Sequence, residues 1–318
     1  MRRSAPLPAT FAALLLITAC DQRTAPTTAD RPSIGTPSFS LQQEPVDSVL
    51  LKKVLDINQQ LVALHLGVAI ERIEFFTIGR GRPGVRLHQA GLRWVPNDPR
   101  RLADGTNITY LVDQSAGATA SGLTSAQTEA AMDAALATWA NDPALKKVQI
   151  IKRPDTGADP DIFDSFFGFG GLGNPFLADI VEAGFLPRAF FEAVDGPGSG
   201  REILAMSISF IFTDDNGIPT DINGDNYFDT ALNEVYYNNT FGDPGDDRVG
   251  NPWRINQALP AVDVQTVALH ENGHSLELGH FGPPPAAVMN PVYAGIRHSP
   301  FAPDDAGLNA VWGSWPNP

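Results

Sequence analysis

The spacing of apolar residues predicts a helix near the start of the foldable part of the chain. Between Pro45 and Ile78, apolar side chains recur at intervals of three and four: Val49, Leu50, Val54, Leu55, Ile57, Leu61 and Leu64. Residues 80–84, Arg-Gly-Arg-Pro-Gly, then interrupt the pattern. We therefore interpret residues 45–91 as a helical segment, which is either a small pro-segment or a helix that packs on the main domain.

The main domain is expected to span residues 92–318. Three mostly apolar stretches predict β-strands at 108–112, 148–151 and 203–212. Between the first two strands, Thr124 and Gln127 form the pattern of a capping box and predict the start of a helix. The run Asn141-Asp142-Pro143 is expected to end that helix.

Residues 157–174 are rich in Gly, Phe and Asp and are expected to form a long loop, and residues 214–250 are turn-rich and acidic. A last helix is expected near residues 308–312. Strands on both sides of one long helix, followed by a helical C-terminal part, predict an α/β or α+β domain.

The first 44 residues are expected to lie outside the fold. Arg2 and Arg3 precede a short apolar run from Phe11 to Ala19, the layout of a secretory signal peptide over residues 1–19. Residues 17–20, Ile-Thr-Ala-Cys, resemble the lipobox of bacterial lipoproteins, which implies lipidation of Cys20. Residues 20–44 are rich in Thr, Pro, Ser and Ala and predict a flexible tether. The expected location is the bacterial cell envelope, periplasmic or at the cell surface, with the protein held to the membrane through lipid on Cys20.

Composition narrows the classes of partner. The formal net charge of −14 argues against nucleic acid as a partner and is compatible with calcium binding. Cys20 is the only cysteine, so a lipidated protein would have no disulfide and would depend on its core or on metals for stability. We expect a monomer.

Three of the six histidines fall within eleven residues, 270–280. His270 and His274 are four residues apart, so on a helix both can face one ion. On a continuous helix His280 would lie about 9 Å beyond His274, too far for Zn–N bonds of about 2.0–2.1 Å. The helix must therefore end soon after Leu276 and the chain must turn back. Three protein ligands would leave one zinc position for water, as in catalytic sites.

Glu271 follows the first of these histidines and is expected to be the catalytic base. It would take a proton from zinc-bound water and pass it to the leaving amine of a cleaved peptide bond. The sequence therefore predicts a zinc-dependent endopeptidase that acts on a protein or peptide substrate.

Residues 270–280 resemble the metzincin motif HExxHxxGxxH, and in particular that of matrixins. The resemblance implies a metzincin-like domain with a twisted mixed sheet, an active-site helix and a helical C-terminal subdomain. It further implies that Met289 lies beneath the zinc in a Met-turn and that Pro291 and Tyr293 line a substrate pocket. By the same analogy, the strand at 203–212 would be the sheet edge along which an extended peptide pairs. Its apolar content also permits a buried strand, which is the alternative.

Glu277 stands where the family motif has glycine. That glycine takes a left-handed turn, a conformation that costs another residue roughly 1 kcal/mol or more. Either Gly279 makes the turn instead, or Glu277 approaches the metal itself. The substitution also motivates an alternative function, that of a catalytically inactive matrixin-like binding module anchored at the cell envelope.

An acidic stretch at 221–229 suggests a possible calcium site. Its oxygen-bearing side chains alternate along the chain, as in calcium loops: Asp221, Asn223, Asp225 and Asp229. The stretch also resembles the matrixin segment that binds structural calcium and a second zinc. Tyr227 stands in place of a zinc-binding histidine, so no structural zinc is expected. A solvated turn is the alternative.

Overall fold

A computed structural model describes residues 48–102 and 107–316. The predicted signal peptide, the predicted tether and Cys20 lie outside these residues. Within the described residues, every helix is too short or too polar to span a bilayer.

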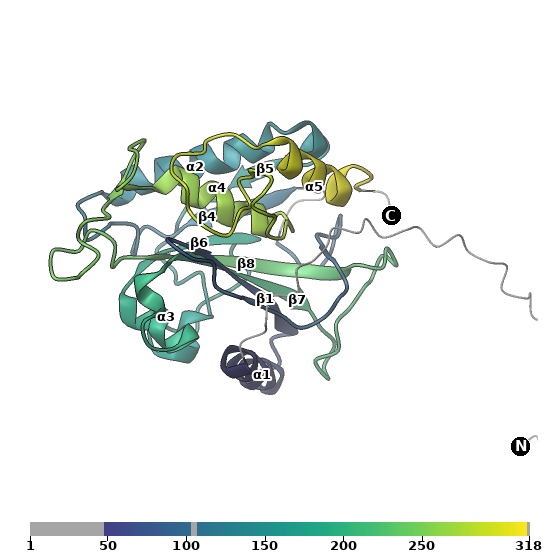
Figure 1. Cartoon of the computed structure of the whole chain (residues 1–318). Helices are drawn as coiled ribbons and strands as arrows, with labels where there is room; N and C mark the ends of the chain where they lie inside the picture. Colours follow the sequence, from purple (N-terminus) through teal and green to yellow (C-terminus); the bar gives the residue numbers. More distant parts are fainter. Residues whose placement is uncertain (1–47, 103–106, 317–318) are drawn as a thin grey trace, which may run out of the picture. The chain divides into compact units, whose positions relative to one another are not determined.

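A seven-strand path of one twisted sheet divides the domain into two layers of helices (Figure 1). The strand order is β2-β1-β7-β8-β6-β4-β5, and a short strand β3 pairs with β8. The strands are β1 (Val68–Thr77), β2 (Val85–Arg86), β3 (Leu92–Arg93), β4 (Ile108–Val112), β5 (Ile150–Lys152), β6 (Ile180–Leu186), β7 (Ile203–Phe212) and β8 (Phe228–Asn238). A separate two-stranded sheet joins β9 (Trp253–Arg254) to β10 (Val262–Asp263).

Helices cover both faces of the large sheet. One face carries α2 (Ser125–Ala140), α4 (Val264–Ser275) and α5 (Ala302–Trp312). The other face carries α1 (Ser48–Ala63) and α3 (Arg188–Asp195). Short 3-10 helices complete the fold at Pro143–Leu145, Asp164–Phe167 and Ser199–Arg201. The expected mixed α/β class with a twisted sheet is confirmed.

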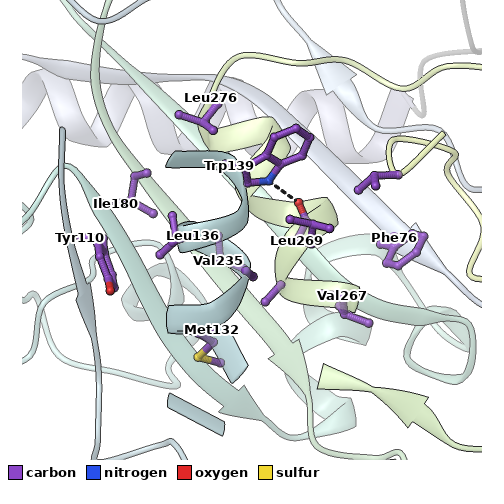
Figure 2. Close-up of a cluster of buried hydrophobic side chains, with 14 of the residues drawn as sticks. Phe76, Tyr110, Met132, Leu136, Trp139, Ile180, Val235, Val267, Leu269 and Leu276 are labelled. Atoms are coloured by element: carbon purple, nitrogen blue, oxygen red, sulfur yellow. Dashed lines mark hydrogen bonds between the residues drawn. The ribbon is translucent and has the colours of Figure 1, made fainter. Parts of the chain in front are cut away.

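Each face of the sheet has its own hydrophobic core. The core under α2 and α4 holds large buried side chains, among them Met132, Leu136 and Trp139 of α2 (Figure 2). The core under α1 and α3 is rich in phenylalanine, with Phe190 and Phe191 fully buried. The sheet therefore presents a rigid surface to α4, the helix that carries the histidine motif.

Several elements form where the sequence predicts them. The strands at 108–112 and 203–212 have the predicted bounds, and the strand predicted at 148–151 lies one to two residues later. Thr124 caps α2 through the predicted box, since its hydroxyl accepts from the Gln127 amide and the Gln127 side chain accepts from the Thr124 amide. The predicted C-terminal helix is α5, which begins six residues earlier than expected.

The helical interpretation of the N-terminal segment is wrong beyond Ala63. Helix α1 ends there, and Val68–Thr77 forms β1, a ten-residue strand in the same sheet as the main domain. Charged residues of β1 are buried along with its apolar ones, so the strand lacks the plain alternation that marks a half-exposed strand.

The turn-rich stretch 214–250 contains a strand that was not predicted, the eleven-residue β8. Its buried positions include Asp229, Thr230, Asn233 and Glu234, polar residues that are typical of a loop when only the sequence is considered. In addition, β6 and α3 form between the predicted strands without having been expected.

The expected role of β7 as a sheet edge is wrong. It pairs antiparallel with β8 on one side and antiparallel with β1 on the other, from Val68↔Phe212 to Thr77↔Ile203. The N-terminal segment thus covers the whole length of β7 on the side where a peptide was expected to bind.

Candidate metal centre

Helix α4 is held at both ends and along its length. The carboxylate of Asp263 caps its first turn by accepting from the Thr266 amide and hydroxyl. Three buried indole N–H groups donate to backbone carbonyls of the motif region: Trp139 to Leu269, Trp94 to Ser275, and Trp312 to Leu276. Figure 2 shows the first of these bonds. These contacts fix where the histidines of α4 point.

The three motif histidines converge. The Nε2 atoms of His270 and His274 are 3.2 Å apart, those of His270 and His280 are 3.2 Å apart, and those of His274 and His280 are 3.1 Å apart. Zn–N bonds of about 2.0–2.1 Å in a tetrahedron place ligand atoms about 3.3–3.4 Å apart. The triad therefore fits a single zinc ion, and it is the only such group of three metal-ligating side chains found among the described residues.

The other ring nitrogen of each histidine has an oxygen partner. His270 Nδ1 lies 2.8 Å from the Val288 carbonyl and His274 Nδ1 lies 2.9 Å from the Leu278 carbonyl. His280 Nδ1 lies 3.3 Å from the Glu74 carboxylate, on β1. A carbonyl accepts only from a protonated nitrogen, so these bonds put the proton on Nδ1 and leave Nε2 free for a metal.

Burial keeps the triad neutral. It lowers the pKa of His270 and His274 well below the usual value and lowers the pKa of His280 to about 3. Neutral imidazole is the form that binds zinc, so the site is ready for a metal at neutral pH.

Glu277 makes the chain reversal itself. Its φ is +71°, whereas Gly279 is not in the left-handed region. The chain turns back with Glu277 N–H donating to the His274 carbonyl and Leu278 N–H to the Gly273 carbonyl. The expectation that Gly279 makes the chain reversal is therefore wrong.

The Glu277 side chain binds Arg72 and Thr230. Its Oε2 is 3.1 Å from the Arg72 guanidinium and its Oε1 accepts from the Thr230 hydroxyl at 2.6 Å. The same guanidinium donates to the His274 carbonyl at 2.8 Å and to the Leu278 carbonyl at 3.4 Å. Both side chains of the ion pair are almost fully buried, at 2% and 1% exposed. The turn residue Glu277 thus forms a buried ion pair with Arg72 of β1.

Glu271 is fully buried on α4, and neither of its carboxylate oxygens has a hydrogen-bond partner among the described residues. Burial raises its pKa well above the usual value, and repulsion from Glu182 and Glu74 raises it further. An unpartnered buried carboxylate is costly unless a cation or a bound water faces it. Its surroundings therefore fit a group that works beside a metal.

Met289 lies directly against the motif helix. A Cβ atom added to Gly273 would overlap the Met289 sulfur, so the glycine lets the Met289 side chain approach the helix closely. The carboxylate of Asp304, on α5, accepts from the Val288 and Met289 amides at 2.7 and 3.1 Å. The C-terminal helix therefore holds the turn that contains Met289.

Pro291 and Tyr293 flank the end of β1. Thr77 N–H donates to the Pro291 carbonyl at 3.2 Å, and Tyr293 N–H donates to the Thr77 carbonyl at 2.8 Å. The Tyr293 ring meets the Phe76 ring edge to face, with centroids 6.0 Å apart. The two predicted pocket residues thus contact a segment of the chain itself.

The oxygens of the predicted calcium loop are used within the protein. Asp221 accepts from the amides of Gly224, Asp225 and Asn226, and Asn223 donates to Asp225. Asp229 turns inward, where it binds Arg100 at 2.7 Å. These side chains do not converge on one point, so the loop gives no support to a calcium site.

Residues 207–313 match the family model described as Matrixin. The match covers about a third of the 318-residue chain, from β7 through α5, and includes all three histidines, Glu271 and Met289. The resemblance carried by the histidine motif is thereby confirmed: this part of the chain is similar to matrixins. The match does not include β1, whose residues Arg72, Glu74 and Phe76 contact the motif.

Sequence reasoning missed these three residues of β1. They occur about 200 positions before the motif, with no spacing that relates them to it. One signal could have placed these residues on a common face. Arg72, Glu74 and Phe76 occupy alternate positions, and alternate residues of a strand point to the same side.

Proposed function

We propose that this protein is a zinc-dependent endopeptidase in which Glu271 is the general base. One observation carries the proposal: three neutral imidazoles meet at Nε2 separations of 3.1–3.2 Å, next to a buried carboxylate, that of Glu271, which has no hydrogen-bond partner within the part of the chain that the structure describes. His270, His274 and His280 would hold the zinc. Bound zinc supplies a Lewis acid that polarises a carbonyl oxygen and makes water acidic.

The chain's own residues account for the proton transfers. Glu271 accepts a proton from the attacking water and donates it to the nitrogen of the leaving amine, so that it ends the cycle as it began. A nearby cation would lower the pKa that burial raises and would keep this carboxylate ionised for the first step. The Nδ1 bonds to Val288, Leu278 and Glu74 hold the imidazoles in the orientation that binding requires.

Glu277 no longer favours a catalytically inactive module. The reversal that brings His280 to the other histidines forms with Glu277 in the left-handed conformation, and its carboxylate is 3.1 Å from Arg72. The inactive alternative requires that a residue other than glycine prevents this turn.

The test compares the parent with Glu271→Gln for zinc content and for cleavage of casein or a quenched extended peptide. The expected variant keeps about one zinc per chain and loses cleavage by about a hundred-fold or more, the range for loss of a general base. Glu234→Gln is the matched control, because Glu234 is equally buried but accepts bonds from the amides of Ile162 and Phe163. Undiminished cleavage by Glu271→Gln would refute the role of Glu271.

A further inference from the structure

A buried side-chain bridge joins the large sheet to the motif helix next to Glu271. Glu182, on β6, accepts from the Asn272 side-chain amide at 2.5 Å and from the hydroxyl of Tyr237, on β8, at 2.6 Å. Asn272 directly follows Glu271 on α4. Glu182, Asn272 and Tyr237 are all fully buried. The bridge therefore connects two strands of the sheet to the turn of α4 that carries Glu271.

Asn272 also binds the preceding turn of its own helix. Its Nδ2 donates to the Ala268 carbonyl, four residues earlier on α4, at 2.9 Å. A side-chain amide nitrogen has two N–H donors, so one can bond to Glu182 while the other bonds to Ala268. The two bonds together fix the rotation of α4 about its axis relative to the sheet.

Glu271 itself has no comparable bond. Neither of its carboxylate oxygens has a hydrogen-bond partner anywhere in residues 48–102 and 107–316. The direction of this side chain therefore depends on the backbone of α4. Successive residues of a helix are separated by about 100°, so the bond that turns Asn272 toward the sheet also sets the direction of Glu271.

Burying the Glu182 carboxylate costs free energy. Burial raises its pKa to about 7, because the ionised form loses its hydration. Val235, which pairs with Glu182 across the strands, belongs to the hydrophobic core on the same side of the sheet as α4. Apolar side chains of similar size often replace buried polar groups without loss of stability. Orientation, and not stability, is therefore what the two directional bonds of Glu182 add.

We propose that Glu182 is a positioning residue for the general base: through Asn272 it holds α4 at the rotation that directs Glu271 toward the metal centre. This role, which rests on the proposed peptidase function, adds Glu182 and Asn272 to the residues that catalysis needs. Tyr237 fixes Glu182 in turn by donating to its second oxygen.

A small rotation of α4 is enough to affect the rate. Side-chain tips lie about 5–6 Å from a helix axis, so a rotation of about 10° moves the Glu271 carboxylate by about 1 Å. A misplacement of about 1 Å can lower a rate by about a hundred-fold. His270 and His274 have further bonds to the carbonyls of Val288 and Leu278, so zinc binding should be less sensitive to the rotation.

Two variants of the full chain test the proposal. Asn272→Leu breaks the bridge and keeps the Glu182 carboxylate. The double variant Glu182→Met with Asn272→Leu replaces both partners by apolar side chains of similar size. The measurements are kcat and KM for a quenched peptide, zinc affinity by chelator competition, and the melting temperature of the zinc-loaded protein.

The double variant should separate activity from stability. It should recover most of the melting temperature that Asn272→Leu loses, because no buried charge remains unpaired. Its kcat should stay about 10- to 100-fold below that of the parent, with KM and zinc affinity within about two-fold. An equal loss of kcat in the single variant, which keeps the carboxylate, assigns the effect to the bridge and not to the charge.

Two adjacent tyrosines of β8 provide a matched control. Both are fully buried, and each hydroxyl donates to a buried carboxylate: Tyr237 to Glu182 at 2.6 Å, and Tyr236 to Glu234 at 2.8 Å. The two rings belong to the cores on opposite faces of the sheet. Tyr237→Phe should lower kcat by about three-fold or more, whereas Tyr236→Phe should leave kcat at the parent value.

The outcomes distinguish this role from a purely structural one. A double variant whose kcat returns to the parent value along with its melting temperature would overturn the positioning role and leave the peptidase function intact. Equal kcat values in Tyr237→Phe and Tyr236→Phe would overturn that role as well. A parent protein that binds zinc but cleaves no peptide would overturn the peptidase function and, with it, the role of Glu182.

Discussion

The ion pair between Arg72 and Glu277 leads to a quantitative prediction. Restoring glycine at position 277 removes a left-handed non-glycine residue and should recover about 1 kcal/mol of backbone strain. The same change leaves the guanidinium of Arg72, 2% exposed, without its carboxylate. Breaking a buried pair from one side costs about 3–5 kcal/mol. Glu277→Gly should therefore lower the free energy of unfolding, although it restores the family motif.

The net effect follows from the contacts that remain. Arg72 keeps its bonds to the carbonyl of His274 and to the hydroxyl of Ser209 at 3.1 Å, so the lower end of that cost applies. We expect a net loss of about 2 kcal/mol. In a domain of this size, about 2–4 °C of melting temperature corresponds to each kcal/mol, so the decrease should be about 4–8 °C.

The assay is thermal unfolding of zinc-loaded and chelator-treated protein, together with zinc affinity by chelator competition. The double variant Arg72→Met with Glu277→Gly should recover most of the loss, because an apolar side chain of similar length leaves no charge unpaired. Glu202→Ala is the control, since it breaks the solvent-accessible pairs with Arg80 and Arg82 and should change stability by less than about 1 kcal/mol. A Glu277→Gly variant that melts at or above the parent would refute the reasoning.

Two further predictions concern packing and pH. Gly273→Ala should lower the free energy of unfolding by about 1–3 kcal/mol and weaken zinc binding, because its new methyl group meets the Met289 sulfur. Thermal unfolding and zinc titration would measure the two effects. An unchanged melting temperature would contradict the contact. The second prediction involves three neighbouring carboxyl groups, those of Asp161, Asp164 and Glu234. Burial raises the pKa of all three, that of Asp164 to about 6 and that of Glu234 to about 7. The pKa values of these carboxyls in the folded state exceed their unfolded values near 4. The protonated carboxyls therefore contribute their full stability below about pH 4, and that stability is lost as pH rises through about 6 to 7. The stability of Asp161→Asn relative to the parent, measured by thermal unfolding, should therefore be greater at pH 8 than at pH 5. The histidine contributions cancel because both proteins contain the same histidines. An equal difference in stability at both pH values would contradict the prediction.

The sequence by itself determined the local features of this protein. The capping box of α2, the apolar strand at 203–212 and the spacing of His270 and His274 depend on residues close together in the chain, so their geometry follows from helix and strand periodicity. The need for a chain reversal before His280 also follows from the helical rise alone. The matrixin resemblance came from the same short stretch.

Only the tertiary structure decided what surrounds the metal centre. Pairing between β1 and β7 joins residues separated by more than 120 positions, and it brings Arg72 to Glu277 and Phe76 to His270. No local periodicity encodes such contacts, since they depend on strand order and register in the assembled sheet. The same reason applies to β8, which forms within a turn-rich, acidic stretch. The buried carboxylate of Glu234, for example, accepts from the amides of Ile162 and Phe163, which reach it only in the folded chain.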